Sequence, residues 1–223
     1  MIDTIAIVSC IWQRPERLQS LLDQLAAQSY DNFDLLLICN NDALYGYVEE
    51  RVSAGELPVA LYRNAENRGP YARIEMMHSL CDRYDYFMTI DDDAEFGPYL
   101  LEQWHAKRDP AAVQGWSGFR FIGNYWQREK AKPGETCQYL WGSNLFVPTA
   151  AVQDAHVLDL PSYCRNQCDD LWLCYHANHV AGLTLRAQQV DMSIHVDGKD
   201  TYMEFRHIKE RCLEDLRARG WAV

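Results

Sequence analysis

The chain has 223 residues, of which 48% are hydrophobic and 24% charged, and its formal net charge is −11. This length is enough for one substantial hydrophobic core, and the ordinary composition indicates a globular protein rather than a fibrous or disordered one. A negative charge of this size repels polyanions, so non-specific binding to nucleic acid or to anionic lipid is not expected.

The sequence gives no sign of a membrane or secreted protein. No apolar run reaches the ~18 to 20 residues of a membrane helix, and Met1-Ile2-Asp3 leads directly into a strand-like run. The eight cysteines show no disulfide-type spacing, so we expect reduced thiols in a cytoplasmic protein without a membrane span. The Lys and Arg residues between Lys199 and Arg219 are interpreted as a solvated helix face.

The first 95 residues alternate apolar runs with amphipathic ones. The apolar runs predict strands at Thr4–Cys10, Asp34–Cys39, Val59–Tyr62 and Tyr86–Ile90. Helical spacing predicts one helix from Pro15 to about Gln28 and another from the turn Asn67–Pro70 to about Cys81. This alternation predicts an α/β domain around a mostly parallel sheet flanked by helices.

The second half is less regular. We expect helices at Pro98–Lys107, Asp169–Ala177 and Tyr202–Arg219, and strands at Val113–Phe121, Gly142–Pro148 and Leu183–Val190, with a loop from Gly123 to Trp141. No linker separates the halves. We therefore predict a single domain, residues 1–223, with a nucleotide-binding half at 1–95 and an acceptor-binding half at 96–223 that ends in a helix.

Polar clusters follow each of the four strands expected in the first half. They are Gln13-Arg14, Asn41-Asp42, Asn67-Arg68-Gly69 and Asp91-Asp92-Asp93. Ligands of open α/β sheets bind at the carboxyl ends of the strands, so these clusters indicate a site of nucleotide size. The sequence contains neither the G-x-G-x-x-G fingerprint nor the phosphate loop G-x-x-x-x-G-K-[ST], which argues against Rossmann dehydrogenases and P-loop nucleoside triphosphatases.

Three adjacent carboxylates at a strand end repel one another unless a positive group joins them. A divalent cation that bridges to a diphosphate removes this repulsion, and hard oxygen ligands suit Mg²⁺ or Mn²⁺. The alternative is a solvated acidic turn.

The order of these motifs resembles the GT-A-fold glycosyltransferases, especially their inverting family-2-like group. The resemblance rests on TIAIVSCIWQRPERL, LLLICNND, NAENRGPYARI, the D-x-D-like FMTIDDDAEFGP and the late acidic pair in CDDLWL. It extends from Thr4 to about His195. It implies a Rossmann-like domain that moves a sugar from a nucleotide-sugar, usually of the uridine type, to an acceptor hydroxyl.

The resemblance also implies roles for individual residues. Asp42 would hold the base or ribose, Asp91 the ribose, and Asp92 would lie beside them at the donor. Further donor contacts would come from Arg14, Asn67 and Arg73. Asp93 would bind the metal, with His195 as a further ligand; an ordinary half-buried histidine is the alternative.

On the acceptor side, the resemblance gives Asp170, with Asp169 beside it, as the base that takes the acceptor's proton. The pair is Asp-Asp where the family usually has Glu-Asp, so the base is assigned only to within one residue. Trp141, Gly142, Ser143 and Asn144 match the family's acceptor-side segment, with a bulge or turn as the alternative. The acceptor stays open between a glycan, a lipid-linked sugar, a small metabolite and a hydroxylated DNA base.

Two other functions are compatible with an α/β fold of this kind. A nucleotidyltransferase that forms a sugar nucleotide has a related core, but the turn after its first strand is usually glycine-rich, and here it reads Cys10-Ile11-Trp12-Gln13-Arg14. A non-catalytic protein that binds a nucleotide or carbohydrate on the same fold would bind without turnover.

Overall fold

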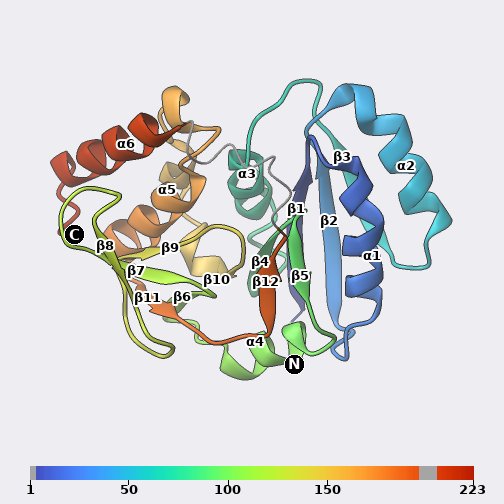
Figure 1. Cartoon of the computed structure of the whole chain (residues 1–223), viewed down its shortest axis with the longest axis horizontal. Helices are drawn as coiled ribbons and strands as arrows, with labels where there is room; N and C mark the ends of the chain where they lie inside the picture. Colours follow the sequence, from blue (N-terminus) through green and yellow to red (C-terminus); the bar gives the residue numbers. More distant parts are fainter. Residues whose placement is uncertain (1–3, 196–204) are drawn as a thin grey trace.

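The computed structural model describes residues 4–195 and 205–223. Its centre is a seven-stranded sheet in the order β11-β6-β10-β4-β1-β2-β3 (Figure 1). The strands are β1 (Ile5–Ile11), β2 (Phe33–Cys39), β3 (Val59–Arg63), β4 (Tyr86–Asp91), β6 (Ala112–Gly115), β10 (Leu145–Pro148) and β11 (Thr184–Ala187). Within the described residues, β10 alone is antiparallel to its neighbours in this sheet. The expected α/β fold with a mostly parallel sheet is confirmed.

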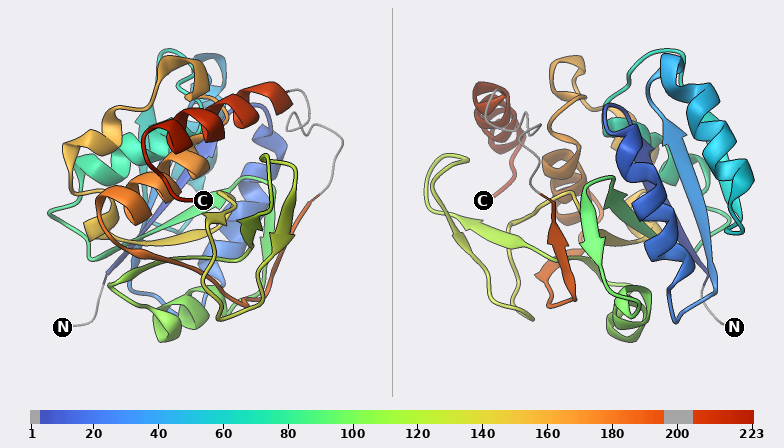
Figure 2. Two further views of the ribbon diagram at one scale, coloured as in Figure 1. Left: turned by 90° about the vertical axis from the view of Figure 1, so that its left-hand side faces the viewer. Right: turned by 45° about the vertical axis from the view of Figure 1, so that its right-hand side comes forward.

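Helices cover both faces of the sheet because its central strands are apolar on both faces. In β1, Ile5 and Ile7 face one core, which α1 (Leu18–Ala26), α2 (Tyr45–Ala54) and α4 (Leu100–Lys107) complete. Ala6 and Val8 face the other core, which α3 (Tyr71–Ser79), α5 (Asp169–Tyr175) and α6 (Arg206–Ala218) complete. Figure 2 shows α6, in red, packed beside α5, in orange.

Two further sheets are small. The strand expected at Val113–Phe121 is in fact two strands in different sheets, with a break at Trp116 and Ser117. Its second part, β7 (Gly118–Phe121), pairs with β8 (Arg128–Lys130) and β9 (Tyr139–Leu140). The expectation of a loop from Gly123 to Trp141 was therefore wrong, because strands of two or three residues are too short to produce a periodic pattern.

Other differences arise where local structure is short or weakly patterned. Helix α2 was not expected, and Val48 is its one buried residue, so its apolar pattern is faint. Strands β5 (Ala94–Phe96) and β12 (Met192–Ile194) form an antiparallel pair that was also missed. The first helix begins with a 3₁₀ turn at Pro15–Arg17, and α5 continues into a π-helix at His176–Val180.

The C-terminal helix agrees with its expected end: α6 stops at Ala218, and Gly220 has a φ of 96°. Its expected start at Tyr202 lies outside the described residues. In the described part of the chain, no helix is both long enough and apolar enough to cross a bilayer.

Candidate active site

A cavity of ≈580 Å³ opens at the carboxyl ends of β1, β2 and β4. Both halves of the chain contribute to its wall. The residues that the sequence predicted and that line it are Arg14, Asn67, Arg73, Asp91, Asp92, Asp93, Trp141, Ser143 and His195. Its volume falls within the usual ~300 to 1,000 Å³ of small-molecule sites.

The three carboxylates after β4 are neutralised in part by Arg14. Its Nη1 lies 3.3 Å from Asp92 Oδ1 and 3.1 Å from Asp93 Oδ2. Burial, together with the negative charge of Asp91 and Asp93, raises the pKa of Asp92 to about 7, against the lowering effect of Arg14. The cluster therefore holds more negative charge than its arginine offsets, as an oxygen-lined cation site would.

Arg73 connects the donor-side carboxylates to the late acidic pair. It is 4% exposed, and its guanidinium donates to Asp91 through Nη1 and to Asp169 through Nη2, the latter over 2.8 Å. Helix α3 thus positions one cation between carboxylates from β4 and α5, which are distant in sequence.

His195 lies beside Asp93 because β12 pairs with β5. The register sets Ile194 against Ala94, and the His195 backbone amide donates to the Asp93 carbonyl over 2.8 Å. The imidazole Nδ1 lies 3.2 Å from a carboxylate oxygen of Glu95. Both expected metal ligands thus line the cavity, although the described residues contain no ready-made group of three or more His, Cys, Asp or Glu ligands.

The structure does not bring Asp42 to the cavity wall. Its carboxylate pairs with Arg63 Nε over 2.6 Å at the surface, and that arginine holds the pKa of Asp42 below its usual value. Asn67 does line the cavity, and its side-chain oxygen accepts a hydrogen bond from the Gly69 amide over 2.8 Å.

The acceptor-side segment separates into two pairs. Trp141 and Ser143 line the cavity, and the buried Ser143 hydroxyl has no hydrogen-bond partner among the described residues. Asn144 is instead fully buried and accepts from the Trp104 indole over 2.8 Å. Gly142 lies against the acidic pair: a Cβ placed there would be 2.9 Å from the Asp170 Cβ.

The two late carboxylates differ in their surroundings. Asp169 accepts a hydrogen bond from Arg73, which lines the cavity. Burial raises the pKa of Asp169, whereas Arg73 lowers it. Asp170 is held by Tyr139 Oη, by the Leu171 amide over 2.8 Å and by Lys209 Nζ over 3.3 Å. Neither side chain is part of the cavity wall in this conformation.

Lys209 corrects the interpretation of the C-terminal segment as a solvated face. It is 5% exposed and shares the buried stripe of α6 with Cys212, Leu213 and Leu216. The spacing 209, 212, 213 and 216 is that of a buried helix face, and this signal was present in the sequence.

Gln13 and Gly69, from the predicted strand-end clusters, also line the cavity. Other residues of its wall were not predicted from the sequence: Cys10, Trp12, Asn40, Pro70, Asn166, Gln167, Ile194 and Phe205. Trp12 could have been predicted from the sequence, because it directly follows the first strand. In the structure it is 40% exposed. Burial raises the pKa of the Cys10 thiol to about 12, which keeps it neutral.

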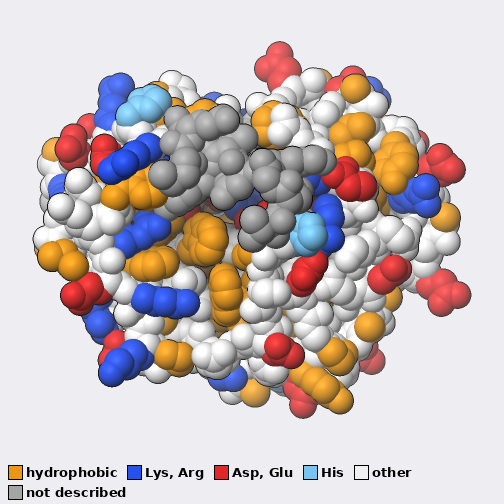
Figure 3. Space-filling model, in the orientation of Figure 1, with side chains coloured by type: hydrophobic (Ala, Val, Ile, Leu, Met, Phe, Trp, Pro, Cys, Tyr) orange, Lys and Arg blue, Asp and Glu red, His pale blue; other side chains and the backbone are white. Residues whose placement is uncertain are grey.

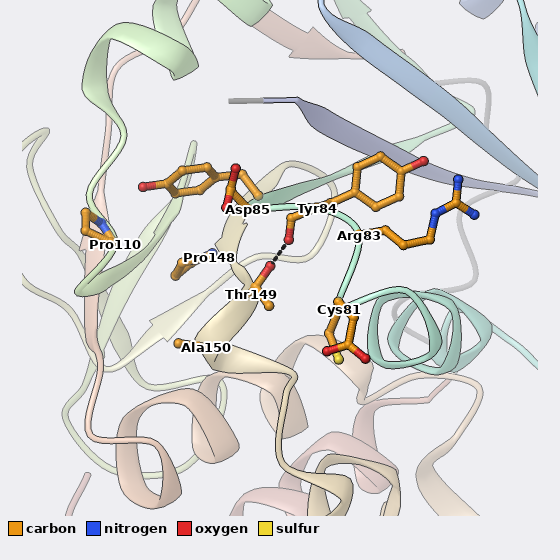
Figure 4. A pocket seen from close by; sticks show the side chains of 10 residues that line it. Cys81, Arg83, Tyr84, Asp85, Pro110, Pro148, Thr149 and Ala150 are labelled. Atoms are coloured by element: carbon orange, nitrogen blue, oxygen red, sulfur yellow. Dashed lines mark hydrogen bonds between the residues drawn. The ribbon is translucent and has the colours of Figure 1, made fainter. Parts of the chain in front are cut away.

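A second cavity, of ≈380 Å³, lies at the opposite end of β4 (Figure 4). Thr149 there donates to the Tyr84 carbonyl, and the Tyr84 hydroxyl donates to Asp34 over 2.8 Å. Neither acidic motif lines this cavity, so the first cavity is the candidate active site.

The chain belongs to glycosyl transferase family 2, whose family model matches residues 6–157. That stretch includes β1 to β4, the three carboxylates and the Trp141–Asn144 segment. The expected membership of the family-2-like GT-A group is thereby confirmed. No curated protein matches the chain in sequence.

Solved structures share the fold at low sequence identity. A mannosyltransferase from Pyrobaculum calidifontis, in complex with GDP-Man and Mn²⁺, superposes with a TM-score of 0.65 at 13% identity over 97% of this chain. TarS from S. aureus, in complex with UDP-GlcNAc, gives a TM-score of 0.60 at 13% identity over 88% of this chain. The matched regions are 65% and 60% of those two chains, so this chain spans less than two thirds of either.

Proposed function

We propose that this protein transfers a sugar from a nucleotide-sugar to an acceptor hydroxyl, in a metal-dependent reaction that inverts the anomeric centre. The observation that carries the proposal is that one cavity contains both Arg73 and the three carboxylates at the end of β4. Arg73 binds Asp91 and also Asp169 of the late acidic pair. Family membership and the donor complexes of the two structural neighbours support this reaction class.

The donor's diphosphate would lie at the end of β4. Asp93 and His195 would hold the metal, with Asp91 and Asp92 near them, and Mg²⁺ or Mn²⁺ is commonly bound by one or two carboxylates together with substrate phosphates. Two protein ligands thus fit a site that the donor completes. When bound, the metal would offset the negative charge of the departing nucleoside diphosphate. Arg14, already beside Asp92 and Asp93, can turn to the same phosphates.

The nucleoside would lie between Trp12, Asn40 and Asn67 at the ends of β1, β2 and β3. Asp42, which pairs with Arg63 outside the wall, would reach the base or ribose only if that ion pair opens.

The base would be one member of the late acidic pair, and two features of the geometry support Asp169. Its carboxylate lies behind Arg73 at the cavity, and its raised pKa makes it a stronger base than an ordinary aspartate. Asp170, in contrast, already accepts hydrogen bonds from Tyr139, Leu171 and Lys209. Trp141 and the unpartnered Ser143 hydroxyl would contact the acceptor.

The test measures product release from UDP-GlcNAc, UDP-glucose and GDP-mannose with Mn²⁺, in the presence of glycans, lipid-linked sugars, small metabolites and hydroxymethylated DNA as acceptors. Nucleoside diphosphate is the expected product. Asp169→Asn should lower kcat about 10² to 10⁴-fold, the usual contribution of a general base. Asp159→Asn, at an exposed carboxylate, is the matched control.

Other outcomes identify the alternatives. Pyrophosphate release from a nucleoside triphosphate in the presence of a sugar phosphate would indicate a nucleotidyltransferase. Nucleotide binding without turnover in any combination would indicate a binding protein. A large loss of kcat in Asp170→Asn, with Asp169→Asn active, would move the base by one residue.

A further inference from the structure

Helix α6 places a buried lysine against the candidate catalytic pair. Lys209 is 5% exposed, and its ammonium lies 3.3 Å from Oδ1 and 3.4 Å from Oδ2 of Asp170, which is 4% exposed. Burial lowers the pKa of Lys209, but Asp170, together with Tyr125, Cys168 and Asp169, outweighs it and raises the pKa above its usual value. The lysine therefore stays charged, and the pair forms an ion pair away from water.

The same carboxylate is fixed from the opposite side by a tyrosine. Tyr139, on β9, is fully buried and donates its hydroxyl to Asp170. Burial and the Asp170 charge raise the pKa of Tyr139 well above its usual value, so the hydroxyl keeps its proton. Tyr125 Oη lies 3.0 Å from Tyr139 Oη and extends the network.

These contacts hold Asp170 behind the cavity wall. The carboxylate lies against Gly142, whose neighbours Trp141 and Ser143 do line the cavity. Its position beside Asp169 is therefore fixed not only by its own helix α5 but also by side chains from α6 and β9.

We propose that Lys209 is a positioning residue of the transfer site, which, with Tyr139, holds the Asp170 carboxylate beside Asp169 and so sets the pH at which the acidic pair can accept a proton. The inference rests on the proposed function. It assigns to α6 a role in the reaction, although α6 lies outside the stretch that the family model matches.

Charged and titratable groups from several elements surround the pair. Those that interact with Asp169 or Asp170 are Arg73 on α3, Cys10 on β1, Cys174 on α5, Tyr139 on β9, and Lys209 and Cys212 on α6. Asp91, Tyr125 and Cys168 act in turn on members of this set. On Asp169, Arg73 and Lys209 favour the charged carboxylate, whereas burial and Asp170 disfavour it. Removal of Lys209 takes a cation from the acidic pair, so the two coupled carboxylates together bind a proton more tightly.

The loss of Lys209 changes how activity depends on pH. A base works only in its charged form, so a higher pKa moves the acidic limb of the kcat/KM profile to higher pH. An opposite charge within ~4 to 6 Å lowers the pKa of a carboxylate by about one to three units. For Lys209→Met we expect a displacement on the order of one unit, with most of the activity recovered at high pH.

The experiment uses nucleoside diphosphate release from UDP-GlcNAc or GDP-mannose, whichever the wild-type protein turns over, between about pH 5 and 9. Lys209→Arg keeps the charge and should keep the wild-type limb. Arg211→Met removes a cation from the exposed side of the same helix and should also keep it. Tyr139→Phe removes a hydrogen-bond donor from the Asp170 carboxylate and leaves Lys209 in place. It also strengthens proton binding by the acidic pair, so it should displace the limb in the same direction even where Lys209→Met folds poorly.

Unmoved limbs in both Lys209→Met and Tyr139→Phe, with lower melting temperatures alone, would overturn the inference and leave a purely structural ion pair. That result is distinct from failure of the proposed function, which would appear as no turnover by the wild-type protein with any donor and would remove both.

Discussion

At the scale of single residues, Arg73 is the side chain on which the site most depends. Its planar guanidinium has donors on two sides, and it uses them on carboxylates from two different elements, Asp91 and Asp169. A lysine could not reproduce this fork. Arg73 and Asp169 are largely removed from water, whereas the Asp91 side chain is 37% exposed. The loss of the cation therefore leaves the buried charge of Asp169 without compensation.

We predict that Arg73→Met lowers the free energy of unfolding by about 3 to 5 kcal/mol, the usual cost of breaking a buried ion pair. Arg68→Met is the control, since the Arg68–Glu75 pair is partly exposed and should contribute about 1 kcal/mol or less. Urea unfolding of the two variants measures both values. Equal stabilities would contradict the role given to Arg73.

The residues that sequence alone could assign are those at the ends of long strands. Asp91, Asp92 and Asp93 follow an apolar run, and the carboxyl edge of a parallel sheet has a known use. Lys209 was misinterpreted because charged residues are usually solvated, and only its position in an apolar helix stripe indicates otherwise. Asp42 shows that a strand-end carboxylate can also pair locally, here with Arg63, so its contact with the donor stays a prediction.

At the scale of elements, the turn before α3 packs closely against the segment that precedes α5. Gly69 has a φ of 64°, and a Cβ there would lie 2.6 Å from the Asn166 Cα and 2.9 Å from the Arg165 carbonyl. The Asn40 side chain donates a hydrogen bond to the Gly69 carbonyl over 2.9 Å. This contact packs the turn directly against the backbone that precedes the late acidic pair.

Gly69→Ala should therefore both destabilise the protein and weaken nucleotide binding. Gly134→Ala is a matched control, because Gly134 has a φ of 86° but open space around its Cα. The control should cost about 1 to 2 kcal/mol from backbone strain alone. Gly69→Ala should cost more, because backbone atoms must also move. Melting curves that show the same loss in both variants would contradict the close packing.

The elements divide in the same way between those that the sequence could predict and those that it could not. Strands β1, β2 and β4 have six or seven residues and were located to within one or two positions. Strands β5, β8, β9 and β12 have two or three residues each. Their hydrogen bonds depend on partners distant in sequence, and a short run carries no period that would reveal them.

At the scale of the whole molecule, the halves expected at 1–95 and 96–223 share one sheet, because β10 pairs with β4 and with β6. The candidate site draws on both halves, through Asp93 from the first and His195 from the second. The net charge of −11 is unevenly distributed: on the face seen in Figure 3, Lys and Arg side chains lie mainly over the half that contains α6, β7 and β8.

The most direct test of the account is thermal unfolding with UDP, GDP, UDP-GlcNAc and GDP-mannose, each with and without Mn²⁺. A ligand at a hundred times its Kd adds roughly 2.7 kcal/mol, which for a chain of this size raises Tm by about 5 to 10 °C. We predict such a rise with one nucleotide in the presence of metal, and its loss in Asp93→Ala. No rise with any nucleotide under either metal condition would contradict the assignment of the cavity as a nucleotide-sugar site.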